Sequence, residues 1–535
     1  MPSVHHTGHR YHSEKTAEQR LLANDFAYRL LLDNLVKLGK RAAPDVLRRA
    51  EEIANAAWSA HPGRFTDGVV ENILLRAGQD LEPGTASATA RRIAAGATRT
   101  LHVATELYLT GGHSRVLAKW VQRDLHSSHA VVVTRQVGPV PDFLSAIAED
   151  RGAPITLLDP NDDIRQRARA LRSLSQDCDR VILHHHPDDA VPVLAYAVPG
   201  GCPVAMFNHA HFAYSLGSGV ADVIINTMPY FRALTGRYRF PQATALLEGS
   251  LGLDRLQWSA IDKRVAKQRL GLPPACPVAM TIGAESYFTP SGNADFFATL
   301  GRLLARRTDL HVLVVGVADA SALVPARIRD TGRVRFVGPV ADPRPYFEAA
   351  DICLESFPTP SLGALTEAVA YGEAFPVPAF AESENPLRVN QPRVSSIAVR
   401  QRTEADYVSY VLHLLDSHEV TRARAATLRR VLVHDDECFG DQFAALYALI
   451  DRAVHAPRQL PATQCAVTHE HIALASRTDP MRLRATIGRL PASGRVAAHA
   501  RAVASGHESI GEAASGVARD LARAVMRRVG LGRKG

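Results

Sequence analysis

Cysteine is scarce in this sequence of 535 residues: there are six cysteines, and no two of them form a CxxC pair. The scarcity argues against a zinc site or a disulfide framework, and it fits the reduced thiols of a cytoplasm. No apolar run approaches the roughly 18–20 residues of a membrane-spanning helix. The first residues also lack the apolar core of a secretory signal. We therefore expect a cytoplasmic protein with no bound metal and no cofactor.

Aromatic residues make up only 6% of the chain, and the basic end of the chain has none that could stack on bases. Residues 480–535 hold eleven Lys and Arg against three acids, which accounts for the whole net charge of +8. Residues 509–529 approximate an amphipathic helix with a cationic face, which suits an anionic membrane surface on the inner face of the cell membrane. A solvated or self-packing helix is the alternative. Nucleic-acid binding is disfavoured because it would require interleaved aromatics.

The apolar patterns divide the chain into five parts. Early apolar residues recur at three-to-four-residue spacing, which predicts helices. From residue 99, short apolar runs alternate with helical stretches, and this rhythm restarts once, as expected for βαβ units with parallel sheets. We predict an α/β protein with two doubly wound, Rossmann-like domains that face each other across a cleft. The parts are a helical extension (1–98), a first domain (99–255), a second domain (256–402), closing helices (403–455) and a basic helical tail (456–535).

Ligands of such sheets bind at the carboxyl ends of the strands. In the first domain, Gly112 precedes a predicted helix and would let a ligand approach the backbone beside His113, although a tight turn is the alternative. His184 and His186 end another predicted strand. Side chains alternate along an extended chain, so a three-histidine metal site is disfavoured and one of these two would line the cleft.

A third motif, Asn208-His209-Ala210-His211, follows another predicted strand. A histidine at such a position could accept a proton from a hydroxyl group near neutral pH. The alternative is a buried histidine whose ring bonds a neighbouring carbonyl.

In the second domain, a loop of small residues (359–363) leads into a helix that starts near Ala364. The N–H groups and the dipole of a helix start would bind a diphosphate. Glu367, about one turn into the helix, could accept hydrogen bonds from a ribose diol. The alternative is an ordinary strand–loop–helix connection with a solvated glutamate.

The second domain resembles the nucleotide-sugar-binding half of GT-B glycosyltransferases, in the broad group that includes glycogen and sucrose synthases. The motifs that carry the resemblance are LGLP, TIGA, LHVLVVG, RFVG and the loop leading to TEAVAYG, in that order. The first domain resembles these enzymes more loosely, through GGHSRV and NHAHFAYSLGSGVADVIIN. The resemblance covers about residues 99–455.

The resemblance implies transfer of a hexose from a nucleotide-diphosphate sugar, without a bound metal, to a glycan, lipid-linked glycan or protein acceptor. It implies that Glu367 holds the ribose and that His209 faces the reacting sugar as the catalytic residue. The donor-binding residues that it implies are Gly112, Val337, Ser361, Leu362, Gly363, Ala364 and Glu367. We assign to the acceptor side of the cleft His113, His184, Asn208 and His211.

Two departures from the family pattern bear on the chemistry. Many relatives carry an acid seven residues before the glutamate, where this chain has Thr359. Relatives also often place Arg and Lys where residues 283–290 hold no base, although a leaving diphosphate must be stabilised. Loop N–H groups could suffice, activity could be lost, or a base could arrive from elsewhere, with three candidates: Arg232, Arg388 and Arg393. The competing hypotheses are a non-catalytic protein that binds a sugar nucleotide or glycan, and a nucleotide-sugar epimerase on the same fold.

Overall fold

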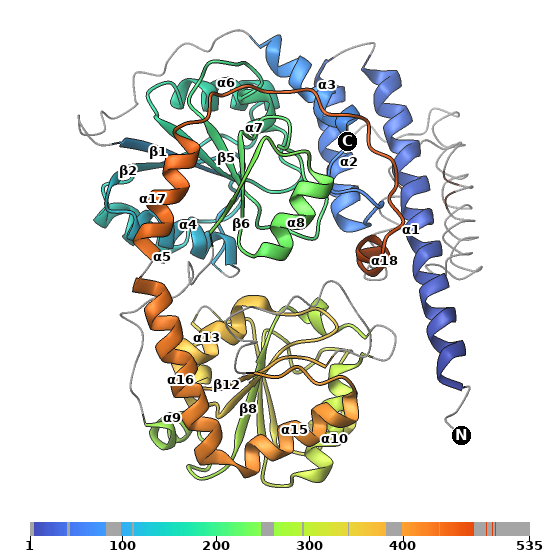
Figure 1. Cartoon of the computed structure of the whole chain (residues 1–535), viewed down its shortest axis with the longest axis vertical. Coiled ribbons are helices and arrows are strands. Elements are labelled where there is room, and N and C mark those ends of the chain that lie inside the picture. The colour runs from blue at the N-terminus through green and yellow to red at the C-terminus, as the bar shows by residue number, and fades with distance from the viewer. Residues whose placement is uncertain are drawn as a thin grey trace, which may run out of the picture.

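The computed structural model describes residues 5–39, 43–81, 98–109, 112–247, 262–290, 294–340, 342–380, 398–437 and 439–475, together with 488, 495 and 498. These residues form two α/β units, one above the other in Figure 1. Each unit contains a parallel sheet. The predicted fold class, two doubly wound Rossmann-like domains in series, is confirmed.

The first sheet has seven parallel strands in the order β3-β2-β1-β4-β5-β6-β7. Its strands are β1 (Thr98–Ala104), β2 (Ser127–Val133), β3 (Ile155–Leu157), β4 (Arg180–His184), β5 (Val204–Phe207), β6 (Val223–Asn226) and β7 (Ala243–Leu246). Strand β1 pairs with β2 on one side and with β4 on the other, so the strand order reverses there. Strands β4, β5 and β6 are buried along their whole length, which explains their continuous apolar runs.

The helices of the first domain are α4 (Gly112–Arg123), α5 (Asp142–Asp150), α6 (Ile164–Leu174), α7 (Val191–Ala195) and α8 (Pro229–Tyr238). Gly112 begins α4, as predicted, and β1 ends before it at Ala104. The sequence analysis did not predict β7, because this edge strand is short and only partly buried.

The second sheet has five parallel strands in the order β10-β9-β8-β11-β12. They are β8 (Val278–Ile282), β9 (His311–Val315), β10 (Val334–Gly338), β11 (Ile352–Leu354) and β12 (Phe375–Val377). Around them lie α9 (Lys263–Arg269), the 3₁₀ helix η2 (Glu285–Phe288), α10 (Phe296–Arg306), α11 (Ala326–Arg329), α12 (Arg344–Ala349) and α13 (Leu362–Gly372).

The closing helices connect the second unit back to the first. They are α15 (Glu404–Asp416), α16 (His418–Glu437) and α17 (Phe439–Ile450). Helix α16 packs on α13, where Leu428 and Leu432 meet Val369. Helix α17 packs on the first domain, where Phe443 and Ile450 share a core with Trp120. The path is orange in Figure 1 and joins the two units along one side.

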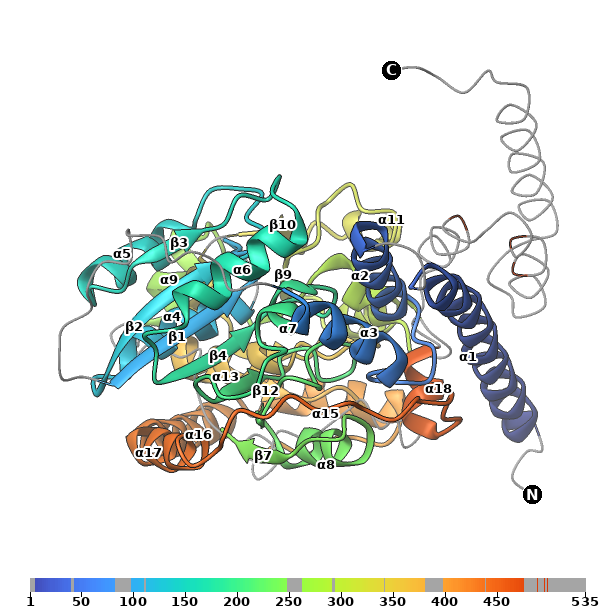
Figure 2. The same ribbon diagram turned by 90° about the horizontal axis from the view of Figure 1, so that it is seen from above.

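The amino-terminal helices pack beside the first domain and share its core. They are α1 (His5–Leu38), α2 (Ala43–Ser59) and α3 (Gly68–Gln79). Residues 456–475, which include α18 (His469–Ala475), lie along these helices; the Ala466 N–H donates to the Gly63 carbonyl at 2.9 Å. Figure 2 shows α1 and α18 on the same flank. Among the described residues no helix is long and apolar enough to cross a membrane. The predicted amphipathic segment 509–529 lies outside the described residues.

Candidate functional site

The loop before α13 leaves space and hydrogen-bonding capacity at the start of that helix. Ser361 precedes the helix, and its hydroxyl is buried without a hydrogen-bond partner in the described part of the chain. At Gly363, an added Cβ would meet no atom within 4 Å. The loop itself is fixed, because Ser356 donates to the Thr359 carbonyl at 2.8 Å and the Thr359 N–H donates to the Tyr287 carbonyl at 3.2 Å. A fixed loop with an open glycine at a helix start suits an anion.

Glu367 lies on the next turn of α13, with its side chain partly exposed. Burial of the carboxyl raises the pKa of Glu367 to about 7, and the positive charge of Arg115 opposes that rise. Arg115 belongs to α4 of the first domain. It also helps to lower the pKa of Asp342 in the second domain, after the larger effect of the hydrogen bond from Arg344. Arg115 therefore brings a positive charge from the first domain to Glu367 and Asp342 of the second.

The loops after β8 and β9 approach each other closely beneath this region. Gly316 has a φ of +93°, and an added Cβ there would lie 2.2 Å from the Gly283 carbonyl oxygen. Only glycine satisfies both conditions. Val337, which the resemblance places along the base, is partly buried at the end of β10. The ends of three adjacent strands thus lie at the same edge as the α13 loop.

A cluster of rings lies at the carboxyl edge of the first sheet. His113, His186 and His209 come after β1, β4 and β5, and the ring centroids of His113 and His186, and of His113 and His209, are each 5.5 Å apart. Tyr108 stacks on His186 at 5.5 Å with an interplanar angle of 7°. We call these four residues the ring cluster. Side chains that follow three separate strands thus meet at one edge.

The histidines of the ring cluster are held neutral by their surroundings. Burial, followed by the other histidines, places the pKa of His209 well below its usual range. Burial also lowers the pKa of His113, whose Nε2 lies 2.9 Å from the Glu106 carbonyl oxygen. Since a carbonyl only accepts, Nε2 of His113 carries the proton. A neutral, partly exposed His209 retains a lone pair that can accept a proton.

Arg239 fixes the loop that carries His209. Its guanidinium is buried, and it donates to the carbonyls of Ala213 at 2.6 Å, Ala210 at 3.3 Å and Phe65 at 3.0 Å, and to the Ser215 hydroxyl. Burial lowers the pKa of Arg239 only to about 10, so the group is charged at neutral pH. Two of these bonds hold the backbone of the loop after His209, the third reaches the hydroxyl of Ser215 in the same loop, and the fourth ties the loop to Phe65 of the amino-terminal extension.

Three residues assigned to the acceptor side lie elsewhere. His184 is fully buried in the sheet, because its side chain points to the face covered by Trp120. Asn208 is also buried; its amide donates to Asn226 at 3.1 Å and to Thr235 at 3.2 Å. His211 is partly exposed but stacks on Phe231 of α8 at 3.8 Å. Of the candidates His184 and His186, it is His186 that belongs to the ring cluster.

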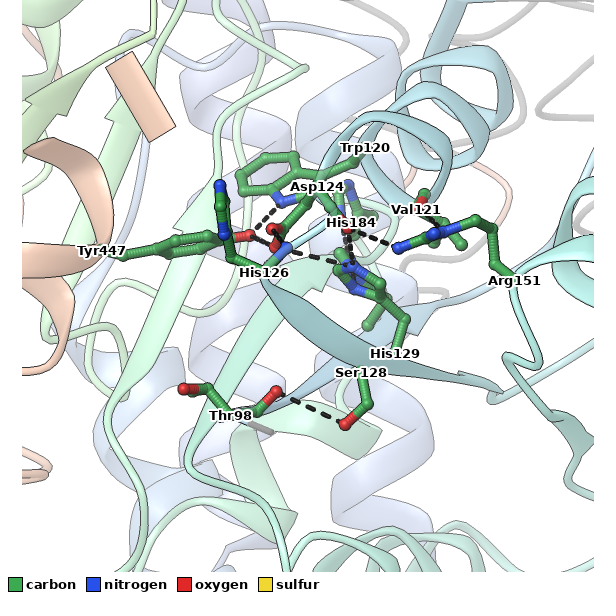
Figure 3. Close-up of polar contacts among 11 residues, drawn as sticks. Thr98, Trp120, Val121, Asp124, His126, Ser128, His129, Arg151, His184 and Tyr447 are labelled. Atoms are coloured by element: carbon green, nitrogen blue, oxygen red, sulfur yellow. Dashed lines mark hydrogen bonds and ion pairs between the residues drawn. The ribbon is translucent and has the colours of Figure 1, made fainter. Parts of the chain in front are cut away.

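The buried His184 ends a row of three histidines across neighbouring strands, of which Figure 3 labels His184 and His129. Nε2 of His184 lies 3.0 Å from Nδ1 of His102, and Nε2 of His102 lies 3.0 Å from Nδ1 of His129. Nε2 of His129 lies 3.2 Å from the Asp124 carbonyl oxygen, which can only accept. Burial favours the neutral form of each ring. Nε2 of His129 must then carry the proton that the Asp124 carbonyl accepts, so Nδ1 of His129 accepts from Nε2 of His102, and Nδ1 of His102 accepts from Nε2 of His184.

The histidine row also lies next to the contact between α17 and the first domain, because both involve Asp124. Tyr447 donates to the Asp124 carboxylate at 2.6 Å and accepts from Trp120 Nε1 at 2.7 Å, as Figure 3 shows. Arg180 lies over the Tyr447 ring at 3.8 Å. The row is therefore a structural network under the point where the chain returns to the first domain.

No family model matches this sequence, and no curated protein matches it. Solved structures do match. HepE of Anabaena, in complex with UDP and glucose, aligns over 66% of this chain and 99% of its own, with 14% identity and a TM-score of 0.50. This chain has a GT-B fold. An O-GlcNAc transferase of Thermobaculum terrenum, in a mutant form, aligns over 81% of this chain and 82% of its own, with 14% identity and a TM-score of 0.48.

Arg115 is a described base whose positive charge acts on Glu367 and Asp342, so it is a candidate replacement for the missing bases of the GT-B pattern. Arg232 donates to the Thr244 hydroxyl at 3.0 Å on the surface of the first domain, and Arg388 and Arg393 lie outside the described residues. Arg115 is the residue that the sequence reading missed, although it lies within the quoted motif GGHSRV. The sequence alone could not connect Arg115 with Glu367, because the two residues lie far apart along the chain. In the described part of the chain, no group of His, Cys, Asp or Glu is arranged to hold a metal ion.

Proposed function

We propose that this protein transfers a hexose from a nucleotide-diphosphate sugar to a glycan, lipid-linked glycan or protein acceptor, and that it does so without a metal. The observation that carries the proposal is the start of α13, where the unpartnered Ser361 hydroxyl and the open Gly363 lie one turn before Glu367. The UDP in the HepE crystals supports a nucleotide as the ligand of this edge. Val337 and the backbone of Leu362 and Ala364 complete the donor side.

In this proposal the α13 N–H groups and Ser361 bind the diphosphate, and Glu367 accepts hydrogen bonds from the ribose. The acceptor oxygen forms a bond to the anomeric carbon while the bond from that carbon to the diphosphate breaks. Arg115 stabilises the charge that develops on the departing diphosphate. His209, at the carboxyl edge of the first sheet, accepts the proton of the acceptor hydroxyl. Gly112, at the start of α4, leaves open space on the opposite side.

The alternative is a GT-B protein that binds a sugar nucleotide or glycan without turnover. The loop after β8 favours it, because residues 283–290 hold no base and Glu285 there accepts a hydrogen bond from Ser321 at 2.6 Å. A negative charge at that position would oppose a leaving diphosphate. The two functions differ in whether nucleotide is released.

The test is release of nucleotide from a panel of nucleotide sugars, with nucleotide affinity measured in parallel by calorimetry. We expect Glu367→Ala to weaken nucleotide binding and His209→Ala to leave binding intact while slowing release by about 10²- to 10⁴-fold. Glu419→Ala, an exposed glutamate on α16, is the matched control and should change neither quantity. Tight binding without release, with or without acceptors, would assign the alternative; no binding of any nucleotide would refute both.

A further inference from the structure

Helix α2 of the amino-terminal extension reaches the edge that carries the ring cluster. It runs antiparallel to α1, back toward the second unit (Figure 1). One side of α2 is core, with Ile53, Ala54 and Ala57 buried. Glu51, Asn55 and Trp58 recur at three-to-four-residue spacing, so they share the flank next to that core.

This flank contacts the loop that follows β4. Asn55 Nδ2 donates to Asp188 Oδ2 at 3.2 Å, and the Ala190 N–H donates to Glu51 Oε1 at 3.2 Å. Arg135 lies 3.6 Å from Asp188 and 3.9 Å from Glu51. Asp188 follows His186 of the ring cluster by two residues. The flank and the cluster therefore share one loop.

One carboxylate oxygen of Asp188 is available to accept a hydrogen bond from a ligand. Its side chain is buried, and Oδ1 has no hydrogen-bond partner among the described residues, while Oδ2 receives Asn55. A buried carboxylate oxygen without a donor is costly, and such a group in a native protein calls for a ligand or water. Hydroxyl groups of a sugar are suitable donors.

Trp58 lies between two contact points of the extension with this edge. Before it in the chain, Asn55 contacts the loop after β4; after it, the Phe65 carbonyl accepts from the Ser215 N–H in the loop after β5 at 2.9 Å. That second loop carries His209. Trp58 lies one helical turn after Asn55 on the same flank of α2, so its side chain neighbours the residue that contacts the loop after β4.

Two aromatic side chains are strongly exposed in the described part of the chain. Trp58 is 42% exposed and Tyr108 is 36% exposed, and the other strongly exposed large apolar residues are aliphatic. Tyr108 stacks on His186, two residues before Asp188, and Trp58 lies one helical turn after Asn55. Aromatic rings pack against the apolar C–H face of a pyranose, and amide, carboxylate and guanidinium groups bind its hydroxyls.

The charges of this surface favour a neutral ligand. Arg135 is already shared between Asp188 and Glu51. Burial, and next the charge of Asp189, raise the pKa of Glu51 to about 7. A phosphate would meet these acids, whereas an uncharged polyol would not be repelled.

We propose that a pyranose acceptor binds between α2 and the loop after β4, stacked on Trp58 with its hydroxyls on Asp188, Arg135 and Asn55. The proposal rests on the proposed function, of which it names the acceptor subsite. It gives the helical extension a role in substrate recognition.

The experiment measures binding of uncharged methyl pyranosides to the full chain by saturation-transfer NMR titration. The probes are the methyl glycosides of glucose, galactose, mannose and N-acetylglucosamine, with sorbitol as a polyol that lacks an apolar ring face. We expect one or more pyranosides to bind and sorbitol not to. Trp58→Ala should weaken that binding about tenfold, and Trp58→Phe should restore most of it. Leu22→Ala, which removes an equally exposed side chain (40%) from α1, should have no effect.

Binding of UDP, measured on the same samples, separates this proposal from the proposed function. Trp58→Ala should bind UDP like the unaltered protein and unfold at the same temperature. If no pyranoside binds, or if Trp58→Ala binds pyranosides equally well, the acceptor subsite is refuted while UDP binding still supports the donor side. If pyranoside binding depends on Trp58 but no nucleotide binds, the acceptor subsite is supported and the proposed transfer reaction is refuted.

Discussion

The two edges that meet at the domain boundary are built from different residue types. The second domain offers small residues, backbone N–H groups and one carboxylate, with open space at Gly363. The first domain offers rings: three histidines and Tyr108, with the loop of His209 held by the buried Arg239. A diphosphate is bound by backbone at a helix start, so its seat needs little side-chain volume. Orientation of an acceptor and removal of its proton need side chains.

Arg115 links the two edges, because it starts in the first domain and acts on Glu367 of the second. In the proposed reaction, nucleotide binding would therefore depend on residues of both domains, whereas proton removal would depend on the first alone. Three substitutions test this division, in order of decreasing expected effect.

A larger side chain at Gly363 should weaken nucleotide binding without affecting the residues of the first domain. Gly363→Val adds a side chain where no protein atom lies within 4 Å, so the fold should tolerate it. The side chain would occupy the seat of the diphosphate. We expect nucleotide affinity measured by calorimetry to fall at least about 100-fold, or roughly 2.7 kcal/mol. Gly301→Ala, in an equally open position on α10, is the control, and unchanged affinity in Gly363→Val would contradict the assignment of this loop.

Removing Arg115 should impair the donor side from across the boundary. We expect Arg115→Ala to reduce kcat/KM about 10- to 100-fold, since a charge-assisted contact is lost. The pKa of Glu367, about 7 with Arg115 present, should rise further without that positive charge. Because binding requires the ionised carboxylate, the pH profile of nucleotide affinity should move to higher pH. Arg123→Ala, at the other end of α4, is the control and should not change the pH profile of nucleotide affinity. If Arg115→Ala also leaves that profile unchanged, the charge of Arg115 does not act on Glu367.

The histidine row should affect stability in acid and leave nucleotide binding unchanged. Burial keeps the pKa of His102 well below its usual value, whereas the unfolded chain protonates this ring near pH 6.5. As pH falls below about 6.5, the unfolded state binds more protons, so the free energy of unfolding decreases by up to about 1.4 kcal/mol per pH unit for each such ring.

His102→Gln keeps one donor and one acceptor in the row and removes one titrating ring. Urea unfolding at pH 7, 6 and 5 should therefore show a shallower loss of stability than in the unaltered protein. His126→Gln, at an exposed position, is the control and should keep the original slope. Equal slopes in His102→Gln and the unaltered chain would mean that the ring is protonated in the folded state.

The fold was predictable because its signals are local. Buried parallel strands are largely apolar, so the runs that became β5, β6 and β9 stand out in the sequence. The short, half-buried β7 has no such signal. Strand-end histidines were found from their position, but burial was not visible: alternation left His184 and His186 as equal candidates, and the packing of Trp120 on one sheet face decided between them.

The sequence by itself determined two α/β units, the helix start at α13 and the position of Glu367 within it, because hydrophobic period and helix-start chemistry act over a few neighbouring residues. Tertiary structure alone decided which cation faces Glu367, which arginine holds the His209 loop and where Trp58 lies. Each of these contacts joins segments far apart in the chain. Their partners depend on how sheets and helices pack, and no local pattern of residues encodes that packing.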